Sequence, residues 1–479
     1  MLIFNGKFAG LSDSKWSGTA GSFATCVGID GHSSPGILKI RQMLEKESAA
    51  VVTEFCKVKL AVSNGINLWF SSTSGKVWAE SSGTYVLVTT LTATAGAAIC
   101  LGAEEFDGYI YMATQSRLHR IALASATITP ADWTGGIALN WANFTITDSS
   151  WHPMVIQGQR LFIGDGTYVA KVSETPHAFT AEALDLKSVF KIKTMAVYDI
   201  DILIGPTVTN NVNKVELIRW DTESPTWTST DPIEEDGINS FIRDDNYLYV
   251  NAGQAGNLYY YNGSQLVSYK RVPGTYSPTK TAEIYPNASA TLLGVPVFGL
   301  SNGSGNPTLE GVYSFGSYGL AYDKVIDLSY PISAGLSGVK IGAIIVRGMN
   351  MWVSWTDGTN KGVDKLNWSK KYTSAYIETT MINLDEKSRD IIKSVANASA
   401  HYALLPEDTA VSFYFKKYSD DSWSDEYESV DDSILRKVSS DKTIPNIANL
   451  QVKIAFTVAT NDAPEIELIS INSGLDDPT

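Results

Sequence analysis

The chain has 479 residues, of which 44% are hydrophobic and 11% aromatic, a composition that suits packed β-sheet and argues against disorder. The formal net charge is −14, so sequence-specific binding to nucleic acid is not expected, because neutralising phosphates requires a surplus of basic side chains. No apolar run is long enough to span a bilayer, and the N-terminus lacks the basic and apolar regions of a signal peptide. We therefore expect a protein made in the cytoplasm with no membrane span.

The three cysteines, Cys26, Cys56 and Cys100, are odd in number and show no C-x-x-C spacing. This pattern excludes a disulfide scaffold and a cysteine zinc site, and it favours buried apolar roles. The five histidines show no metal-binding spacing, and no phosphate-binding or dinucleotide-binding motif occurs. The sequence therefore predicts no metal and no cofactor.

Residues 1–50 differ in composition from the rest of the chain. Residues 7–21 are rich in Gly, Ser and Ala and are typical of an extended arm. Residues 22–40 fit two short strands joined by the turn Ser34-Pro35-Gly36. We expect this region to supply an N-terminal arm, together with strands that close a ring formed by the following repeats.

Residues 51–368 contain a phrase that recurs seven times: an apolar strand, a short polar turn and an aromatic-rich strand. The phrases start about 40 to 50 residues apart, which is the period of a four-stranded propeller blade. A repeat of this length cannot bury its own apolar face, so neighbouring repeats must stack around an axis. The phrases are Lys59–Phe70, Glu104–Ala113, Met154–Ile163, Met195–Ile204, Ser240–Val250, Thr291–Leu300 and Ile344–Val353.

The turn residues of this region indicate strands rather than helices. Asn64-Gly65 and Asp107-Gly108 are favoured hairpin turns, because these residues tolerate a positive φ angle. Alternation with a period of two follows each turn, and it places one face of the strand against the next blade. The sequence therefore predicts an all-β fold with a seven-bladed β-propeller over residues 51–368. Six or eight blades are the alternatives, if Ser81–Cys100 or residues 22–50 form a blade of their own.

Residues 369–479 follow a different pattern, with longer strands and no blade repeat. Alternating or continuous apolar strands are predicted at Tyr376–Ile382, Val411–Tyr418, Leu450–Val458 and Pro464–Ile471. Several antiparallel strands within roughly 110 residues are typical of a β-sandwich. We expect a C-terminal β-sandwich over residues 369–479.

Two regions of the sequence resemble virion proteins of tailed bacteriophages. The N-terminal region comprises Gly28-Ile29-Asp30 and the run His32–Lys39, which precede the propeller repeats. The C-terminal region is similar to the sandwich module carried by many phage tail proteins, and ring-shaped propellers occur as the hub or nozzle of short-tailed phages. Its matching segments are Tyr376–Thr379, Val411–Tyr418 with Trp423, and the final strand at Pro464-Glu465-Ile466.

The resemblance implies a structural component of the virion tail, as a hub or nozzle on the tail axis or as a fibre-associated part of the distal tail. Such a protein acts through assembly contacts, so no enzymatic activity is expected. Its implied partners are further copies of itself in a homo-oligomer and other tail proteins. A host surface saccharide or receptor is a further implied partner.

A saccharide-binding tail protein is the leading alternative. Tryptophans stack on sugar rings, and several lie outside the expected strands, where they could contact a receptor or ligand. The competing interpretation is that they pack between blades. The candidates are Trp133, Trp141, Trp151, Trp227 and Trp423.

A propeller glycosidase is the third alternative. It requires two carboxyl groups that face each other across the sugar bond. The acidic residues beside the expected turns are Glu104-Glu105, Asp199, Asp201, Glu234-Glu235-Asp236 and Asp244-Asp245. Acidic side chains are favoured at turns for backbone reasons alone, so these residues are interpreted as turn chemistry.

Overall fold

The computed structural model of the chain is an all-β structure made mostly of strands. It describes residues 2–4, 8–12, 21–31, 33–34, 36–47, 52–92, 98–147, 149–208, 214–244, 247–272, 282–302, 309–317, 324–383, 393–402, 405–417, 422–424, 428–431, 437–439, 444–447, 449–459 and 461–475. Within these ranges, no helix is both long and apolar enough to cross a membrane.

The chain divides into two compact units. Unit 1 consists of Met1–Glu45, Val312–Ser333 and Leu366–Thr479, and unit 2 of Lys46–Gly311 and Ala334–Lys365. Two of these divisions fall close to the predicted boundaries after residues 50 and 368. The segment Val312–Ser333, by contrast, lies inside the range predicted for the propeller but belongs to unit 1.

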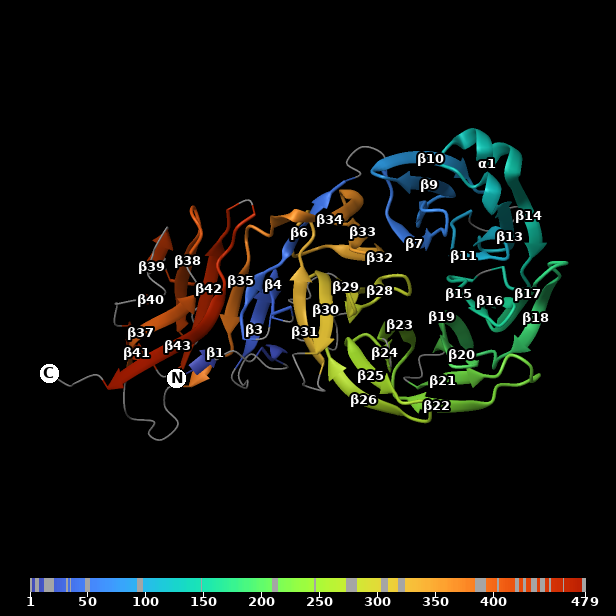
Figure 1. The fold of residues 1–479 in the computed structure, drawn as a ribbon. Coiled ribbons are helices and arrows are strands. Elements are labelled where there is room, and N and C mark those ends of the chain that lie inside the picture. Colours follow the sequence, from blue (N-terminus) through green and yellow to red (C-terminus); the bar gives the residue numbers. More distant parts are fainter. Residues whose placement is uncertain are drawn as a thin grey trace. The chain divides into compact units, whose positions relative to one another are not determined.

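The chain forms a β-propeller with six four-stranded blades, which are arranged around a common axis in Figure 1. The first three blades are β7 (Cys56–Ala61), β8 (Asn67–Ser71), β9 (Lys76–Ser81) and β10 (Thr84–Thr90); β11 (Gly102–Phe106), β12 (Tyr109–Ala113), β13 (Arg117–Ala122) and β14 (Ile137–Asn143); and β15 (Met154–Gln157), β16 (Arg160–Asp165), β17 (Tyr168–Ser173) and β18 (Phe179–Asp185). A 3-10 helix, η1 (Leu123–Ser125), and a short helix, α1 (Pro130–Gly136), connect β13 to β14.

The other three blades complete this set. They are β19 (Phe190–Tyr198), β20 (Asp201–Val208), β21 (Val215–Trp220) and β22 (Ser229–Ile233); β23 (Ile238–Asp244), β24 (Tyr247–Ala252), β25 (Asn257–Tyr261) and β26 (Leu266–Arg271); and β32 (Lys340–Arg347), β33 (Asn350–Thr356), β34 (Lys361–Lys371) and β6 (Gln42–Lys46).

All seven recurring phrases of the sequence form antiparallel hairpins, and six of them lie in separate four-stranded sheets. The predicted count of seven blades is not confirmed, because Thr291–Leu300 forms the hairpin of β28 (Ser289–Leu292) and β29 (Val295–Asn302), which is part of a larger sheet and not of a separate four-stranded one. The short strand β27 (Ala282–Glu283) also pairs with β29. This hairpin packs between the first strands of the fifth and sixth blades, β23 and β32.

Glycines set the turns and the spacing of the inner strands. Gly65 and Gly108 have φ angles of 98° and 76°, as the predicted hairpin turns require. Gly102, on the first strand of the second blade, has a different role. A Cβ atom there would lie 1.7 Å from the carbonyl oxygen of His152, so only glycine permits this approach between neighbouring blades.

The side chains of Glu47 and Arg347 join the first and sixth blades. We call these two residues, together with their hydrogen-bond partners, the closure seam. The carboxylate of Glu47 accepts hydrogen bonds from Tyr85 Oη at 2.7 Å, Trp352 Nε1 at 3.0 Å and Lys365 Nζ at 3.0 Å. The second side chain is that of Arg347, which donates through Nε to Asn67 Oδ1 at 2.7 Å. Its guanidinium also donates to the carbonyl oxygens of Val62 and Ile66. The ring is therefore closed by partly buried polar contacts as well as by strands.

Unit 1 contains two larger sheets and the two-stranded sheet of β4 (Ile29–Asp30) and β5 (Lys39–Ile40). The first larger sheet holds β1 (Leu2–Phe4), β43 (Ile466–Leu475), β37 (Lys393–Tyr402), β40 (Lys437–Ser439) and β41 (Ile444–Ile447). The second includes, in order, β30 (Gly311–Ser317), β31 (Lys324–Tyr330), β3 (Ser22–Val27), β35 (Tyr376–Thr379), β42 (Asn449–Thr457), β38 (Ala410–Lys417) and β39 (Glu428–Asp431). The strands β2 (Gly10–Leu11) and β36 (Ile382–Asn383) pair with β3 and β42.

One hydrophobic core in unit 1 contains side chains from both larger sheets. Phe4, Tyr402 and Ile469 come from the first sheet, and Phe23, Phe413 and Ile454 come from the second. Alternation along β42, where every second residue is buried, supplies one face of this core. N-terminal and C-terminal segments of the chain therefore fold together in unit 1.

The three cysteines are buried and form no disulfide. Cys26 belongs to the core of unit 1, and Cys56 and Cys100 belong to the propeller. Burial raises the thiol pKa of all three. They therefore serve as small apolar core residues, as their spacing suggested.

Candidate functional site

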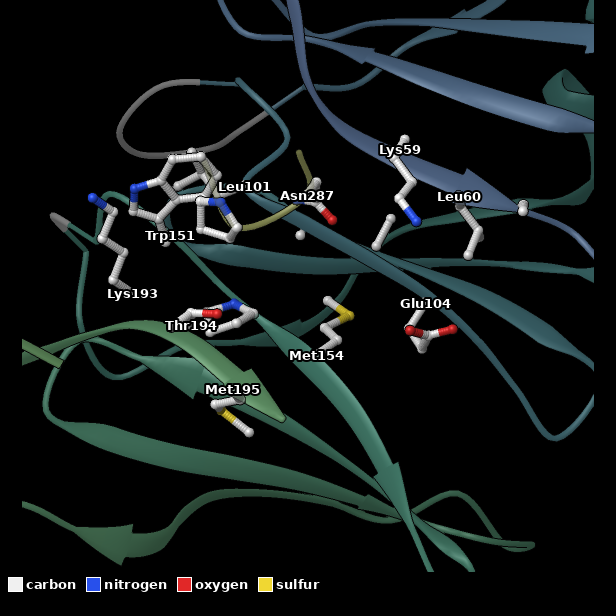
Figure 2. A pocket seen from close by; sticks show the side chains of 15 residues that line it. Lys59, Leu60, Leu101, Glu104, Trp151, Met154, Lys193, Thr194, Met195 and Asn287 are labelled. Atoms are coloured by element: carbon white, nitrogen blue, oxygen red, sulfur yellow. The ribbon is translucent and has the colours of Figure 1, made fainter. Parts of the chain in front are cut away.

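A cavity of about 220 Å³ lies among the inner strands of the propeller (Figure 2). We call it the axial cavity, and its lining comes from β7, β11, β19, the region around the start of β15 and the segment before β28. The polar and aromatic side chains that line it are Lys59, Glu104, Trp151, Lys193, Thr194 and Asn287.

Strand alternation explains why charged residues line this cavity. Along β7 the side chains of Cys56, Val58 and Leu60 are buried, whereas Lys57 and Lys59 alternate with them and are only partly buried. On β19, the partly buried Lys193 follows the buried Ile192 in the same way. Each strand therefore directs apolar side chains into the packing between blades and presents lysines on the other face.

Lys59 and Glu104 lie on neighbouring inner strands and interact electrostatically. Burial raises the pKa of the Glu104 carboxyl to about 7, although the backbone N–H of Glu105 and the Lys59 ammonium favour its charged form. Burial likewise lowers the pKa of Lys59, and the charge of Glu104 opposes that shift. Near neutral pH, the Glu104 carboxyl is therefore partly protonated.

Lys193 connects the axial cavity to a second one. Its ammonium forms an ion pair with Glu283 and donates a hydrogen bond to Asn239 Oδ1 at 2.7 Å. These three residues, with Asp236 and Gln254, line an adjacent cavity of about 280 Å³. Lys193 is thus held by protein groups on the side of the adjacent cavity.

Trp151, which lines the axial cavity, packs beside Tyr285. The rings of Trp151 and Tyr285 have centroids 6.2 Å apart. The ammonium of Lys57 lies 4.5 Å from the centroid of Tyr285 and 6.0 Å from that of Trp151, within the range of a cation–π interaction. Asn287 is fixed nearby, because its Nδ2 donates to the Lys57 carbonyl oxygen at 3.2 Å.

The five tryptophans predicted as ligand contacts do not gather at one site. Trp151 lines the axial cavity. Trp133 lies in α1, is 0% exposed and donates from Nε1 to the Thr127 carbonyl oxygen at 2.8 Å. Trp133 therefore lies outside the strands, as expected, and it is buried, which agrees with the competing interpretation of a packing role.

The remaining three tryptophans contact basic side chains away from this cavity. Trp141 lies within β14 rather than in a loop, and the guanidinium of Arg120 stacks 4.3 Å from its centroid. The Nζ atom of Lys187 lies 5.8 Å from the ring centroid of Trp227, and that of Lys416 lies 5.9 Å from the ring centroid of Trp423.

Of the acidic candidates, Glu104 lines the axial cavity and Asp236 lines the adjacent one. Glu105 and Asp201 serve local contacts. Glu105 accepts hydrogen bonds from the backbone N–H and hydroxyl of Ser63, and Asp201 forms an ion pair with Arg219. Asp245 falls outside the described residues.

Sequence reasoning did not single out Lys59, Lys193 or Asn287. The usable signal was the alternation of lysines with buried residues in Cys56–Leu60 and again in Phe190–Lys193. In the part of the chain that the structure describes, no three His, Cys, Asp or Glu side chains gather closely enough to hold a metal ion.

No family model matches the chain, and no curated protein matches it. Among solved structures, the extracellular domain of a candidate hybrid two-component system from B. thetaiotaomicron is 15% identical, with a TM-score of 0.48 over 77% of this chain. The match covers only 44% of that structure.

Two smaller propellers are also similar. The β-propeller domain of Cps50 (Swd1) from Myceliophteria thermophila is 11% identical, with a TM-score of 0.46 over 67% of this chain and 100% of that one. Virginiamycin B lyase from Staphylococcus aureus is 12% identical, with a TM-score of 0.46 over 68% and 99%. At these values the similarity concerns the fold and says nothing about activity or partners.

Proposed function

We propose that the protein is a non-enzymatic structural component of a tailed-phage virion, located in the tail as part of the hub or nozzle or of the distal tail. One observation carries this proposal: the N-terminal and C-terminal segments that resemble phage virion proteins are hydrogen-bonded to each other in unit 1. Leu38 and Ile466 exchange two backbone hydrogen bonds, at 2.8 and 3.0 Å.

A finer architecture belongs to the same proposal. The hairpin β28–β29 takes the place of a seventh blade in the ring, because its first strand continues the succession of inner strands from β23 to β32. Unit 1 is proposed to be a β-sandwich, since both of its larger sheets contribute to one core. The closed propeller then serves as a rigid platform, and unit 1 supplies contacts to other copies and other tail proteins.

The lining of the axial cavity favours binding over glycoside hydrolysis. A glycosidase needs a pair of carboxyl groups on opposite sides of the sugar bond. The carboxyl group among the residues that line this cavity is that of Glu104. A single carboxyl can hold or release a proton, but it does not supply both halves of that mechanism.

The virion assignment is tested on purified particles of the phage that encodes the chain. We expect peptides of the protein in those particles, and immunogold label at the tail by negative-stain electron microscopy. Antibody pre-absorbed with the purified protein is the control. Particles that lack both peptides and label, with the epitope shown to be accessible, would remove the virion role. Light scattering of the purified protein tests the proposed homo-oligomer.

Saccharide binding is the second candidate function, and Trp151 favours it. This tryptophan lies at the wall of a cavity that also presents Lys59, Thr194 and Asn287, so an aromatic face and polar groups converge. Sites that bind small polar ligands combine these two elements.

A further inference from the structure

The ammonium of Lys59 is the least satisfied charge at the axial cavity. Among the described residues, no hydrogen-bond acceptor is found for its Nζ atom, and its electrostatic partner is Glu104, which is partly protonated near neutral pH. Lys193 differs, because Glu283 and Asn239 already hold its ammonium. A partly buried cation without a fixed counter-charge is unfavourable, and a ligand anion would relieve that cost.

The size and walls of the cavity limit what this anion can be attached to. A cavity of about 150 Å³ holds a benzene ring, so the 220 Å³ measured here suits one six-membered ring with substituents. Trp151 offers an aromatic face, and Asn287 and Thr194 offer hydrogen-bonding groups. Hydroxyl groups on such a ring would match these polar neighbours.

We propose that the axial cavity binds an acidic monosaccharide, of the uronic or sialic acid class, with its carboxylate at Lys59 and one ring face toward Trp151. This inference rests on the saccharide-binding candidate function. It does not depend on the virion role. The virion role is tested on purified particles, whereas this inference is tested by binding measurements on the purified protein.

Glu104 makes this binding sensitive to pH. The charged groups around it are Lys59 on β7, Glu105 on its own strand and Lys193, which lines the same cavity from β19. As pH rises through the pKa of Glu104, its carboxylate would repel the ligand's carboxylate next to Lys59. The affinity for the acidic sugar is therefore expected to fall between about pH 6 and about pH 8.

The test is isothermal titration calorimetry on the full chain with four probes at constant ionic strength. They are glucuronic acid, N-acetylneuraminic acid, neutral glucose and inorganic phosphate. At about pH 6 we expect at least one acidic sugar to bind about tenfold more tightly than glucose and phosphate. Equal binding of phosphate, equal binding of glucose, or no binding of either acidic sugar would overturn the proposal.

Variants assign the binding to this cavity. Lys59→Gln and Trp151→Leu should each lower the affinity for the acidic sugar about tenfold. The matched controls are Lys187→Gln and Trp227→Leu, because these two residues form a lysine–tryptophan pair at 5.8 Å outside the cavity. Unchanged affinity in the two cavity variants would contradict the site.

A second variant covers the case in which Lys59→Gln does not fold. Glu104→Gln keeps the volume of the side chain but cannot ionise, so its affinity should no longer fall above about pH 7. The same pH dependence in wild type and Glu104→Gln would also contradict the proposed site.

Discussion

The closure seam and the axial cavity both place charged side chains between strands of the propeller, but they satisfy them differently. At the seam, the Glu47 carboxylate receives three hydrogen bonds, and Arg347 donates to three acceptors. At the cavity, Lys59 faces a carboxyl group that is partly protonated. The seam charges contribute to stability, whereas we propose that the Lys59 ammonium at the cavity pairs with the carboxylate of a ligand.

This difference separates two kinds of polar residue that have the same appearance in the sequence. A paired and buried ion stabilises the ring only while every partner remains, because removing one leaves the others unsatisfied. An unpaired ion costs stability, so its removal should have the opposite sign. The following predictions test that contrast.

The largest effect is expected for Glu47→Ala. The change leaves Tyr85, Trp352 and Lys365 without their shared acceptor, so the free energy of unfolding should fall by about 3 kcal/mol. Urea denaturation followed by circular dichroism measures it. Glu223→Ala is the control, because this carboxylate is 72% exposed and its ion pair with Arg160 should contribute little. Equal losses in both variants would show that the seam has no special role.

A smaller loss is expected for Arg347→Met, which keeps much of the side-chain volume. The change removes the donors to Asn67 and to the carbonyl oxygens of Val62 and Ile66, and we expect a loss of about 2 kcal/mol. Arg160→Met is the matched control. If the two arginine variants unfold at the same urea concentration, the seam contacts of Arg347 add nothing.

The Glu104 carboxyl predicts a pH dependence of stability with a definite sign. Its pKa of about 7 in the folded protein lies above the ordinary value of 4.5, so the folded state holds its proton more tightly. The associated stability is present below about pH 4.5 and is lost as pH rises through about 7. Allowing for solvent screening, about 1 kcal/mol is expected. The difference in unfolding free energy between wild type and Glu104→Gln should change by this amount across that range.

The smallest effect is expected for Lys59→Met, and it has the opposite sign. Removing the poorly paired ammonium while keeping the length of the side chain should raise the free energy of unfolding by about 0.5 kcal/mol. Lys187→Met, at an exposed position, should change little. A clear loss of stability in Lys59→Met would mean that the cavity charge is as well satisfied as those of the seam.

Much of the propeller could be predicted from turn chemistry and strand alternation, since both are local properties. Each of the seven phrases forms a hairpin, but the number of further strands on each hairpin depends on segments distant in the sequence. The strand β6 shows this, because residues 42–46 pair with β34, more than three hundred positions later. The segment around Thr291–Leu300 could therefore be recognised as a hairpin without its blade being countable.

The candidate site was harder to predict, because it depends on which side chains several blades bring together. Trp151 and Glu104 were among the candidate tryptophans and acidic residues. Nothing in the sequence distinguished them from Trp133 or Glu105, which do not line the cavity. Lys59 has its significance only because its neighbours in space leave its charge poorly balanced. That property is absent from the local sequence, where lysines alternating with apolar residues are ordinary on any half-buried strand.

The three buried cysteines give each unit its own chemical reporter of unfolding. A buried thiol with a raised pKa does not react with an alkylating reagent until the surrounding structure opens. Alkylation at Cys26 therefore records the opening of unit 1, and alkylation at Cys56 or Cys100 records that of unit 2. A reagent pulse at increasing urea, read by peptide mass, would tell whether the two units unfold as one cooperative body or in sequence, with no label added to the chain.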